Sequence, residues 1–452
     1  MNKQDALKKF VAQKMQEHHI PGVSIGILTA EGREIHSFGV TNVNHPMAVT
    51  DDTLFQIGSN TKTMTATLLM MLAYDGKLDL DAPIQTILPD FKVKDESVSA
   101  AATVRQLLTH STGWVGDHFV ETGAGADAYQ QYVESMAELG QLAPPDVAAS
   151  YNNAAFAVAG LIIETLTNKP YEQALVELLF KPLGMAHSLI EPGDVMLHSF
   201  AVGHDITPEG EAKVAGPWPL PRAMHSMGAV AASAGDMLTY AQFYMDHGKT
   251  ADGSQILAPE AIQELWKPQF DTASDRGWVA HSWFVENDGG YNGYCHGGAT
   301  VGQLSAFKII PELNFAYTSL TNGETGRLFN ADFERWVLEH YCSIVPTVTE
   351  PINPSAEQLN ELVGTYSRPM QDIEVKLEGN QLMMRHIPKQ GFPTADVPPR
   401  PATPWFPIAL VSDNVLMAQD GPGKGAKGEI VRLEDGSIGW IRMGLRLHAT
   451  NR

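Results

Sequence analysis

Strand-like segments stand at both ends of a long helical region, and this order restricts the fold more than any other feature of the sequence. Residues 22–30 and 33–40 are strand-like runs on either side of a turn at Glu31 and Gly32, which predicts a β-hairpin. From about residue 64 to residue 270 the pattern is mainly helical. Strand patterns then return at residues 281–287, 302–310 and 314–320, and a helix is predicted at about 326–342.

A chain with this order is expected to form a two-lobed α/β domain. Strands from the two ends can pair in one antiparallel sheet flanked by helices, while the middle of the segment forms an all-helical lobe. The junction of two such lobes is a usual place for a ligand cleft. We assign this domain to residues 1–345.

The spacing of the apolar residues changes after a proline-rich segment at residues 346–358, which is typical of a linker. Short runs within residues 359–452 alternate at period two and are separated by turns at 378–380 and 434–436. Roughly ninety residues of such short strands predict a small antiparallel β-barrel as a second domain.

Charge and cysteine content exclude several classes of protein. The 452 residues carry a formal net charge of −21, and an acidic surface repels nucleic-acid phosphates and anionic lipid headgroups. We therefore expect neither a nucleic-acid nor a membrane partner. Only two cysteines, Cys295 and Cys342, are present, which excludes a disulfide framework and a cysteine-rich metal site.

The first nineteen residues read as an amphipathic helix, with Leu7, Phe10, Val11 and Met15 along one stripe, and not as a signal peptide. No apolar run approaches the roughly 20 residues that a membrane span needs. We expect a soluble, cytoplasmic protein. An envelope location stays open if a leader precedes this sequence.

Two serines are followed three residues later by a lysine, Ser59 by Lys62 and Ser305 by Lys308. Ser305 lies in an alternating strand pattern, where residues three apart face opposite ways, so that pair cannot meet. Ser59 begins a helix, where positions three apart share a face. Lys62 can then point its amine at the Ser59 hydroxyl. The plainer interpretation is that Ser59 caps the helix and Lys62 is solvated.

Two further segments have the residue types that such a pair needs. Tyr151-Asn152-Asn153 precedes an apolar helical stretch and supplies a phenol that can move protons. His296-Gly297-Gly298 precedes a strand, and its glycines let the backbone approach a ligand closely. Alternatively, Tyr151 packs at a helix start, the glycines form a hairpin turn and His296 is an ordinary surface residue.

Together the three segments resemble the motif set of serine β-lactamases and penicillin-binding proteins, in the form found in class C β-lactamases, D-aminopeptidases and family VIII esterases. Residues 107–113, 181–185 and 227–243 also resemble recurring segments of this superfamily, and the similarity covers about residues 5 to 343. The predicted barrel resembles the lipocalin-like domain that some of these hydrolases carry.

The resemblance implies a role for each matched residue. Ser59 would be the nucleophile that forms an acyl-enzyme, with Lys62 and Tyr151 as a coupled pair that takes its proton. Asn153 would orient Lys62 and bind a substrate amide. The backbone N–H groups of Ser59 and Ala299 would form the oxyanion hole.

His296 stands where the more common third motif has a lysine. Lysine offers a fixed cation to a substrate carboxylate, whereas histidine is neutral or partly charged at neutral pH. Gly297 and Gly298 would lie beside it in the substrate site. The resemblance therefore implies a serine hydrolase of small peptides, amides or esters, with D-stereoselective peptidase or esterase activity. Transfer of the acyl group to an amine, as in a peptide cyclase, and weak β-lactamase activity stay open.

Aromatic side chains are candidates for lining the cleft. Trp218 is favoured because it lies in a rigid, apolar loop between prolines. Core packing is the ordinary alternative for each of them. The candidates are Trp114, Phe119, Trp218, Trp283 and Tyr291.

Three rival classes are weaker. A cysteine hydrolase would pair Cys295 with His296, but adjacent residues of an extended segment point to opposite sides. A metal hydrolase lacks the H-E-x-x-H and H-x-H patterns, so we expect neither a metal nor another cofactor. A non-catalytic binding or sensor homologue would have no use for a paired nucleophile and base. A homo-oligomer stays open.

Overall fold

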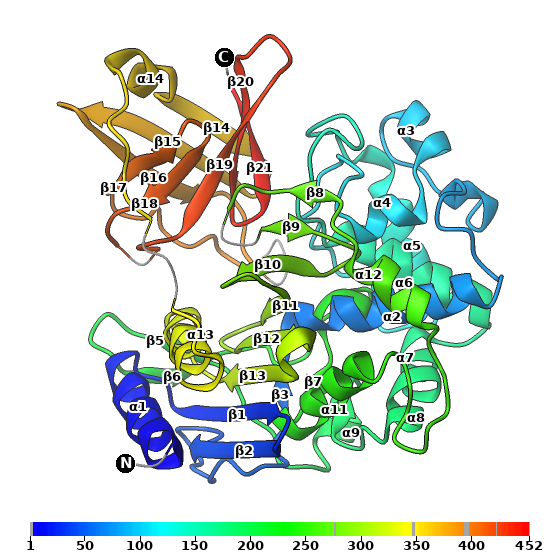
Figure 1. Cartoon of the computed structure of the whole chain (residues 1–452). Coiled ribbons are helices and arrows are strands. Elements are labelled where there is room, and N and C mark those ends of the chain that lie inside the picture. Colours follow the sequence, from blue (N-terminus) through cyan, green and yellow to red (C-terminus); the bar gives the residue numbers. More distant parts are fainter. Residues whose placement is uncertain (1–2, 275–276, 346–348, 393–396, 422, 452) are drawn as a thin grey trace.

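The computed structural model describes residues 3–274, 277–345, 349–392, 397–421 and 423–451. It contains a two-lobed α/β domain with an antiparallel sheet, and a closed eight-stranded barrel at the C-terminal end (Figure 1). The fold class predicted from the sequence is confirmed. Residues 346–348 of the predicted linker lie outside the described residues.

The large sheet has eight antiparallel strands in the order β2-β1-β13-β12-β11-β10-β9-β8. Strand β1 pairs with β2 in the predicted hairpin and with β13 on its other side, so both ends of the domain meet in one sheet. The strands are β1 (Gly22–Thr29), β2 (Gly32–Gly39), β8 (Phe270–Asp271), β9 (Trp278–Val279), β10 (Phe284–Asp288), β11 (Tyr291–Ala299), β12 (Leu304–Ile310) and β13 (Phe315–Thr321).

Helices cover the sheet on both faces. The apolar side chains of Val23, Ile25 and Ile27 on β1 pack in one cluster with residues of α1 (Lys3–Glu17) and α13 (Gly326–Cys342). Helix α11 (Ala234–Met245) contacts β1, β2 and β13. The period-two alternation of β1 thus places every second side chain in the core beneath α1 and α13.

Helix α2 (Thr61–Tyr74) runs through the centre of the molecule and is buried over most of its length. Its threonines are satisfied by neighbouring elements, as buried polar groups require. Thr65 contacts the hydroxyl of Tyr171, and Thr67 contacts those of Tyr240 and Tyr244. These bonds connect α2 to helices α7 (Tyr171–Leu175) and α11.

Helices of the second lobe surround α2 (Figure 1), and the domain also contains the small sheets β3-β7-β4 and β5-β6. No helix among the described residues combines the length and apolar character that crossing a membrane requires. The remaining helices are α3 (Glu96–Ala101), α4 (Val104–Leu108), α5 (Ala128–Ser135), α6 (Ala154–Thr167), α7 (Tyr171–Leu175), α8 (Lys181–Leu183), α9 (Pro192–Val195), α10 (His225–Gly228) and α12 (Pro259–Trp266). The short turns and strands are η1 (Gly58–Asn60), η2 (Ile84–Thr86), η3 (Met136–Glu138), η4 (Val176–Phe180), η5 (Arg222–Met224), η6 (Pro311–Leu313), β3 (Phe55–Gln56), β4 (Ser188–Leu189), β5 (His204–Ile206), β6 (Ala212–Val214) and β7 (Ala231–Ala232).

The barrel is closed by pairing of its first and last strands, β14 and β21. Helix α14 (Ala356–Glu361) precedes it and begins inside the predicted linker, where Ser355 and Gln358 form a capping box. The strands are β14 (Gly364–Arg368), β15 (Gln371–Glu378), β16 (Gln381–Pro388), β17 (Phe406–Ser412), β18 (Val415–Ala418), β19 (Lys427–Arg432), β20 (Ile438–Met443) and β21 (Arg446–Thr450).

Candidate active site

Ser59 lies in the 3-10 turn η1, between the short strand β3 and the buried helix α2. The Nζ atom of Lys62 lies 3.1 Å from Ser59 Oγ and donates to the carbonyl oxygen of Met227 at 2.6 Å. The N-cap residue of α2 is Asn60, and it makes no side-chain capping bond. Ser59 therefore meets Lys62 as the helical spacing predicts.

Lys62 is fully buried. Burial, together with the nearby positive charge of Arg446, lowers the pKa of the Lys62 amine well below its ordinary value, against the opposing effect of Asp117. A lowered pKa favours the neutral amine, which keeps one lone pair and is the form that a general base needs. Lys62 Nζ also lies within hydrogen-bond distance of Ser59 Oγ.

Tyr151 lies immediately before helix α6, in the triplet that the sequence singled out. Lys62 Nζ lies 5.0 Å from the centroid of the Tyr151 ring. The His110 ring packs against Tyr151, with the two ring centroids 4.5 Å apart, and its Nδ1 accepts the backbone N–H of Asn152. We refer to the side chains around the Tyr151 ring as the Tyr151 corner. Asn152 Oδ1 in turn accepts the N–H of Ala155 in the first turn of α6.

Asn153 is held by a carboxylate that the sequence analysis did not identify. Its Nδ2 donates to Asp117 Oδ1 at 2.7 Å. Asp117 also receives bonds from two arginines of the barrel, Arg368 at 2.6 Å and Arg446 at 2.7 Å. Burial opposes ionisation of Asp117, but the charges of Arg446 and Arg368 outweigh it and hold the pKa of this carboxyl well below its ordinary value.

The end of strand β11 packs directly against the turn that carries Ser59. Gly58 has a φ of 52°, and a Cβ atom there would lie 2.5 Å from the backbone nitrogen of Ala299. A Cβ atom on Gly298 would lie 1.9 Å from the carbonyl oxygen of Ile57. Only glycine fits either position, and Ala299 is thereby placed beside the Ser59 turn.

Ser305 stabilises the contact between the sheet and the turn that carries Ser59. Its Oγ donates to the Ile57 carbonyl oxygen at 2.7 Å and accepts from Asn60 Nδ2 at 2.7 Å. Lys308 points elsewhere, as the strand geometry predicts, and forms ion pairs with Glu286 and Asp288. The second S-x-x-K match is therefore a structural element next to the first.

His296 is buried on β11. Its ring centroid lies 6.1 Å from that of Tyr151 and 5.0 Å from that of Phe284. Its Nδ1 lies 2.6 Å from the carbonyl oxygen of Gly297. The alternative that His296 is an ordinary surface residue is wrong, and its ring belongs to the same corner as Tyr151.

The aromatic candidates separate into core and periphery. Trp283 is fully buried and packs with Tyr240, Tyr244 and Phe307, so the prediction that it contacts substrate is corrected: a solvent-borne molecule cannot reach it. Trp114 is also in the core.

The other aromatic candidates lie nearer the surface. Trp218 is half-buried against Phe200, and its carbonyl oxygen accepts from Gln56, close to the Ser59 turn. Phe119 packs edge-on against Phe392 of the second domain. Tyr291 is exposed at the start of β11.

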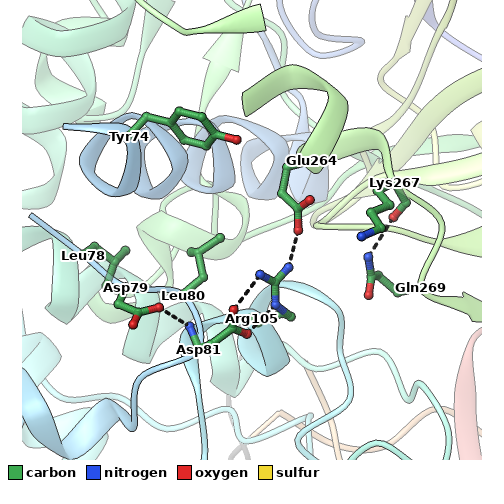
Figure 2. A pocket seen from close by; sticks show the side chains of 9 residues that line it. All are labelled: Tyr74, Leu78, Asp79, Leu80, Asp81, Arg105, Glu264, Lys267 and Gln269. Carbon is green, nitrogen blue, oxygen red and sulfur yellow. Dashed lines mark hydrogen bonds and ion pairs between the residues drawn. The ribbon is translucent and has the colours of Figure 1, made fainter. Parts of the chain in front are cut away.

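Figure 2 shows a cavity of about 540 Å³ at the opposite end of α2, where Tyr74 lies. Since an α-helix rises about 1.5 Å per residue, Tyr74 is roughly 18 Å along the helix from Lys62. In this cavity Arg105 forms ion pairs with Asp81 and Glu264. Two carboxylates neutralise its guanidinium, and the distance along α2 shows that the cavity is separate from the Ser59 site.

Some acidic and histidine side chains among the described residues lie close enough together to hold a metal ion. One group consists of Glu286, Asp288 and Glu334. The ammonium of Lys308 lies between them, 2.7 Å from Glu286 and 2.5 Å from Glu334. The Lys308 ammonium therefore occupies the position that a metal ion would take between these carboxylates.

The residues that sequence reasoning missed are Asp117, Met227, Arg368 and Arg446. Met227 lies in residues 227–243, a segment already noted as similar to the superfamily, but only the fold brings its carbonyl to Lys62. Asp117 and Arg446 are 329 residues apart, and no local pattern connects them.

Comparison with known proteins places this geometry among related chains. The protein-family model described as Beta-lactamase matches residues 7–340. Penicillin-binding protein 4 of Amycolatopsis lactamdurans is 33% identical over 361 residues, which are 78% of this chain and 94% of that protein. An unguisins hydrolase, ungD', of Aspergillus campestris is 26% identical over 326 residues, 69% of this chain and 60% of that protein. The solved structure of SurE with D-Leu superimposes with a TM-score of 0.74 at 22% identity and covers 99% of both chains.

Proposed function

This chain belongs to the beta-lactamase family, and from that premise we propose that it is a serine hydrolase that acts through an acyl-enzyme on Ser59. The observation that carries the proposal is the pairing of Ser59 Oγ with a buried amine 3.1 Å away, whose pKa burial lowers well below its ordinary value. A buried amine with a strongly lowered pKa beside a hydroxyl is typical of a catalytic base and its nucleophile.

The contact between Ser59 and Lys62 supports the following first half-reaction. The Ser59 hydroxyl attacks a carbonyl carbon while its proton passes to the coupled pair of Lys62 and Tyr151. The developing oxyanion is stabilised by the backbone N–H groups of Ser59 and Ala299. The same pair returns the proton to the leaving amine or alcohol, and an acyl-enzyme remains.

The second half-reaction transfers the acyl group to water, which releases an acid and restores Ser59. Small peptides, amides and esters are the proposed substrates, with preference for D-configured residues. One relative bears the name of a hydrolase and another that of a penicillin-binding protein, and an acyl-accepting serine accounts for both names. An amine in place of water would give an acyltransferase or cyclase.

A fluorophosphonate probe tests the proposal on the whole chain. We expect labelling of the wild type and its loss in Ser59→Ala. Turnover of D- and L-amino-acid amides, short esters and nitrocefin, each compared with Ser59→Ala, then ranks the substrate classes. A wild type that takes no label and turns over no ester would identify a binding protein. Ester turnover that survives in Ser59→Ala would assign the chemistry to another group.

A further inference from the structure

A hairpin of the barrel reaches into the candidate active site. Strands β20 and β21 are joined by a two-residue turn in which Gly444 and Leu445 both have positive φ. The carbonyl oxygen of Leu445 accepts the backbone N–H of Tyr151 at 2.7 Å, and the N–H of Leu447 donates to Ser150 Oγ. In Figure 1 this hairpin stands next to β8, which Arg442 contacts.

The residue that follows the turn, Arg446, lies over the Tyr151 ring, with Cζ 4.8 Å from the ring centroid. Lys62 Nζ lies 5.0 Å from the same centroid, so these two groups are at most about 10 Å apart. The Arg446 side chain keeps 28% of its surface exposed. The Arg446 side chain is therefore partly exposed and lies near the amine of Lys62.

The charges around Arg446 do not cancel. Asp117 is a single carboxylate, and both Arg446 and Arg368 pair with it. Arg368 also contacts His448, and burial lowers the pKa of His448 to about 3.

Burial disfavours the charged forms of three other neighbours. Burial lowers the pKa values of His386, Lys62 and His110. The guanidiniums of Arg368 and Arg446 therefore share the single carboxylate of Asp117.

The guanidinium also has donors to spare. Its bonds to described residues use Nε and Nη2 toward Asp117 and one N–H of Nη1 toward the Gly444 carbonyl. Arginine has five N–H donors in a planar fork, so one remains on each terminal nitrogen. A carboxylate accepts such a pair of donors in a bidentate arrangement.

We propose that Arg446 is a specificity-determining residue, contributed by the barrel, that binds a free carboxylate of the substrate while Ser59 attacks its scissile carbonyl. This inference rests on the proposed acyl-enzyme function of Ser59. The barrel is then part of the substrate site, and the preferred substrates are short acyl compounds with one carboxylate a few bonds from the reacting bond.

Matched substrates test this assignment. Two esters that differ only in a terminal carboxylate or carboxamide are compared on the wild type, Arg446→Gln, Arg446→Lys and the barrel control Arg432→Gln. We expect the wild type to favour the carboxylate ester in kcat/KM. A hydrogen bond to a charged group is worth enough for the preference to fall roughly tenfold or more in Arg446→Gln. It should persist in Arg432→Gln and be partly kept in Arg446→Lys.

The ratio of the kcat/KM values for the two esters separates recognition of the carboxylate from positioning of the active site. A distorted active site would lower kcat/KM equally for both esters. An unchanged ratio in folded Arg446→Gln, or no preference in the wild type, overturns the proposal. Should Arg446→Gln fail to fold, inhibition of wild-type ester turnover by N-acetylglycine and by N-acetylglycinamide decides instead. Tighter inhibition by the acid supports the carboxylate site, and equal inhibition contradicts it. Loss of all ester turnover in Ser59→Ala shows that the proposed function holds in either case.

Discussion

Arg446 of the barrel and Asp117 of the helical lobe form a two-point ion pair, with Nε 2.7 Å from Oδ2 and Nη2 3.2 Å from Oδ1. Because Asp117 also accepts from Asn153, the pair links the barrel to the triplet that carries Tyr151. The second domain is therefore joined to the candidate active site through a buried charge.

Removal of that charge should destabilise the protein. In Asp117→Asn the guanidiniums of Arg368 and Arg446 lose their counter-charge, and breaking a fully buried pair typically costs about 3–5 kcal/mol, an upper bound here because Arg446 is partly exposed. The free energy of unfolding in urea measures the loss. The control is Asp75→Asn, because Asp75 is exposed and its ion pair with Lys77 is long at 3.4 Å. Equal free energies of unfolding for the two variants would show that the Asp117 ion pairs do not stabilise the fold.

The Asp117 charge also predicts a dependence on acid. A carboxyl whose pKa is lowered in the folded state stabilises the fold above its unfolded pKa and loses this contribution as the pH falls through the folded value. Wild-type stability should therefore fall on acidification more steeply than that of Asp117→Asn. Parallel curves of unfolding free energy against pH would contradict the lowered pKa.

The pH dependence of kcat/KM should reveal the pKa of the Lys62 amine, which lies next to Ser59. The neutral form of Lys62 is the base, so kcat/KM should rise with pH through a value well below the ordinary lysine pKa. Arg446→Gln removes a charge that disfavours the ammonium, and the acidic limb should move to higher pH. The limb belongs to the coupled pair of Lys62 and Tyr151, and loss of the Arg446 charge shifts both groups in the same direction. An unmoved limb, or one that moves to lower pH, contradicts the account.

Ser305 should hold the nucleophile turn in place. In Ser305→Ala the Ile57 carbonyl and the Asn60 amide lose a buried partner, at a cost of about 1–3 kcal/mol. Displacement of Ser59 by about an ångström would lower kcat/KM by roughly ten- to a hundredfold. Ser24→Ala is a matched control, since Ser24 is equally buried on β1 and its Oγ has no described partner. Kinetics and unfolding are measured on both, and a Ser305→Ala enzyme as active as Ser24→Ala refutes the role.

A methyl group at Gly298 should separate the two halves of the oxyanion site. Its Cβ would lie 1.9 Å from the Ile57 carbonyl, so β11 and the backbone of Ala299 must move away from Ser59. Loss of one oxyanion donor costs about 10²–10³ in kcat. Gly140→Ala is the comparison, because nothing lies within 4 Å of its Cβ position. Similar kcat values for the two variants would place the oxyanion site elsewhere.

The sequence predicted those features that depend on neighbours along the chain. The helix expected at residues 326–342 coincides with α13, and the pairing of Ser59 with Lys62 follows from a single helical turn. Strand β11 was missed because its glycines and asparagine have low strand propensity. It forms because β10 and β12 pair with it on both sides.

Features that depend on distant contacts left no trace in the sequence. A tryptophan such as Trp283 can line a pocket or pack in a core, and the sequence does not distinguish the two. Its packing against Tyr240 and Phe307 places it in the core. Arg446 lies in an ordinary strand pattern of the barrel. Closure of the barrel against the helical lobe brings it to Tyr151, and no spacing rule relates the two residues.

The central claim is that Ser59 carries the acyl group, and trapping of the acyl-enzyme by acid quench tests it most directly. Enzyme is mixed with excess activated ester, quenched within milliseconds and digested, and the peptides are weighed by mass spectrometry. We predict one acyl group on the peptide that contains Ser59. In Lys62→Met its formation should be slower by about 10²–10⁴, the usual contribution of a general base. An acyl group on another residue, or steady turnover with no covalent adduct at any quench time, would contradict the account.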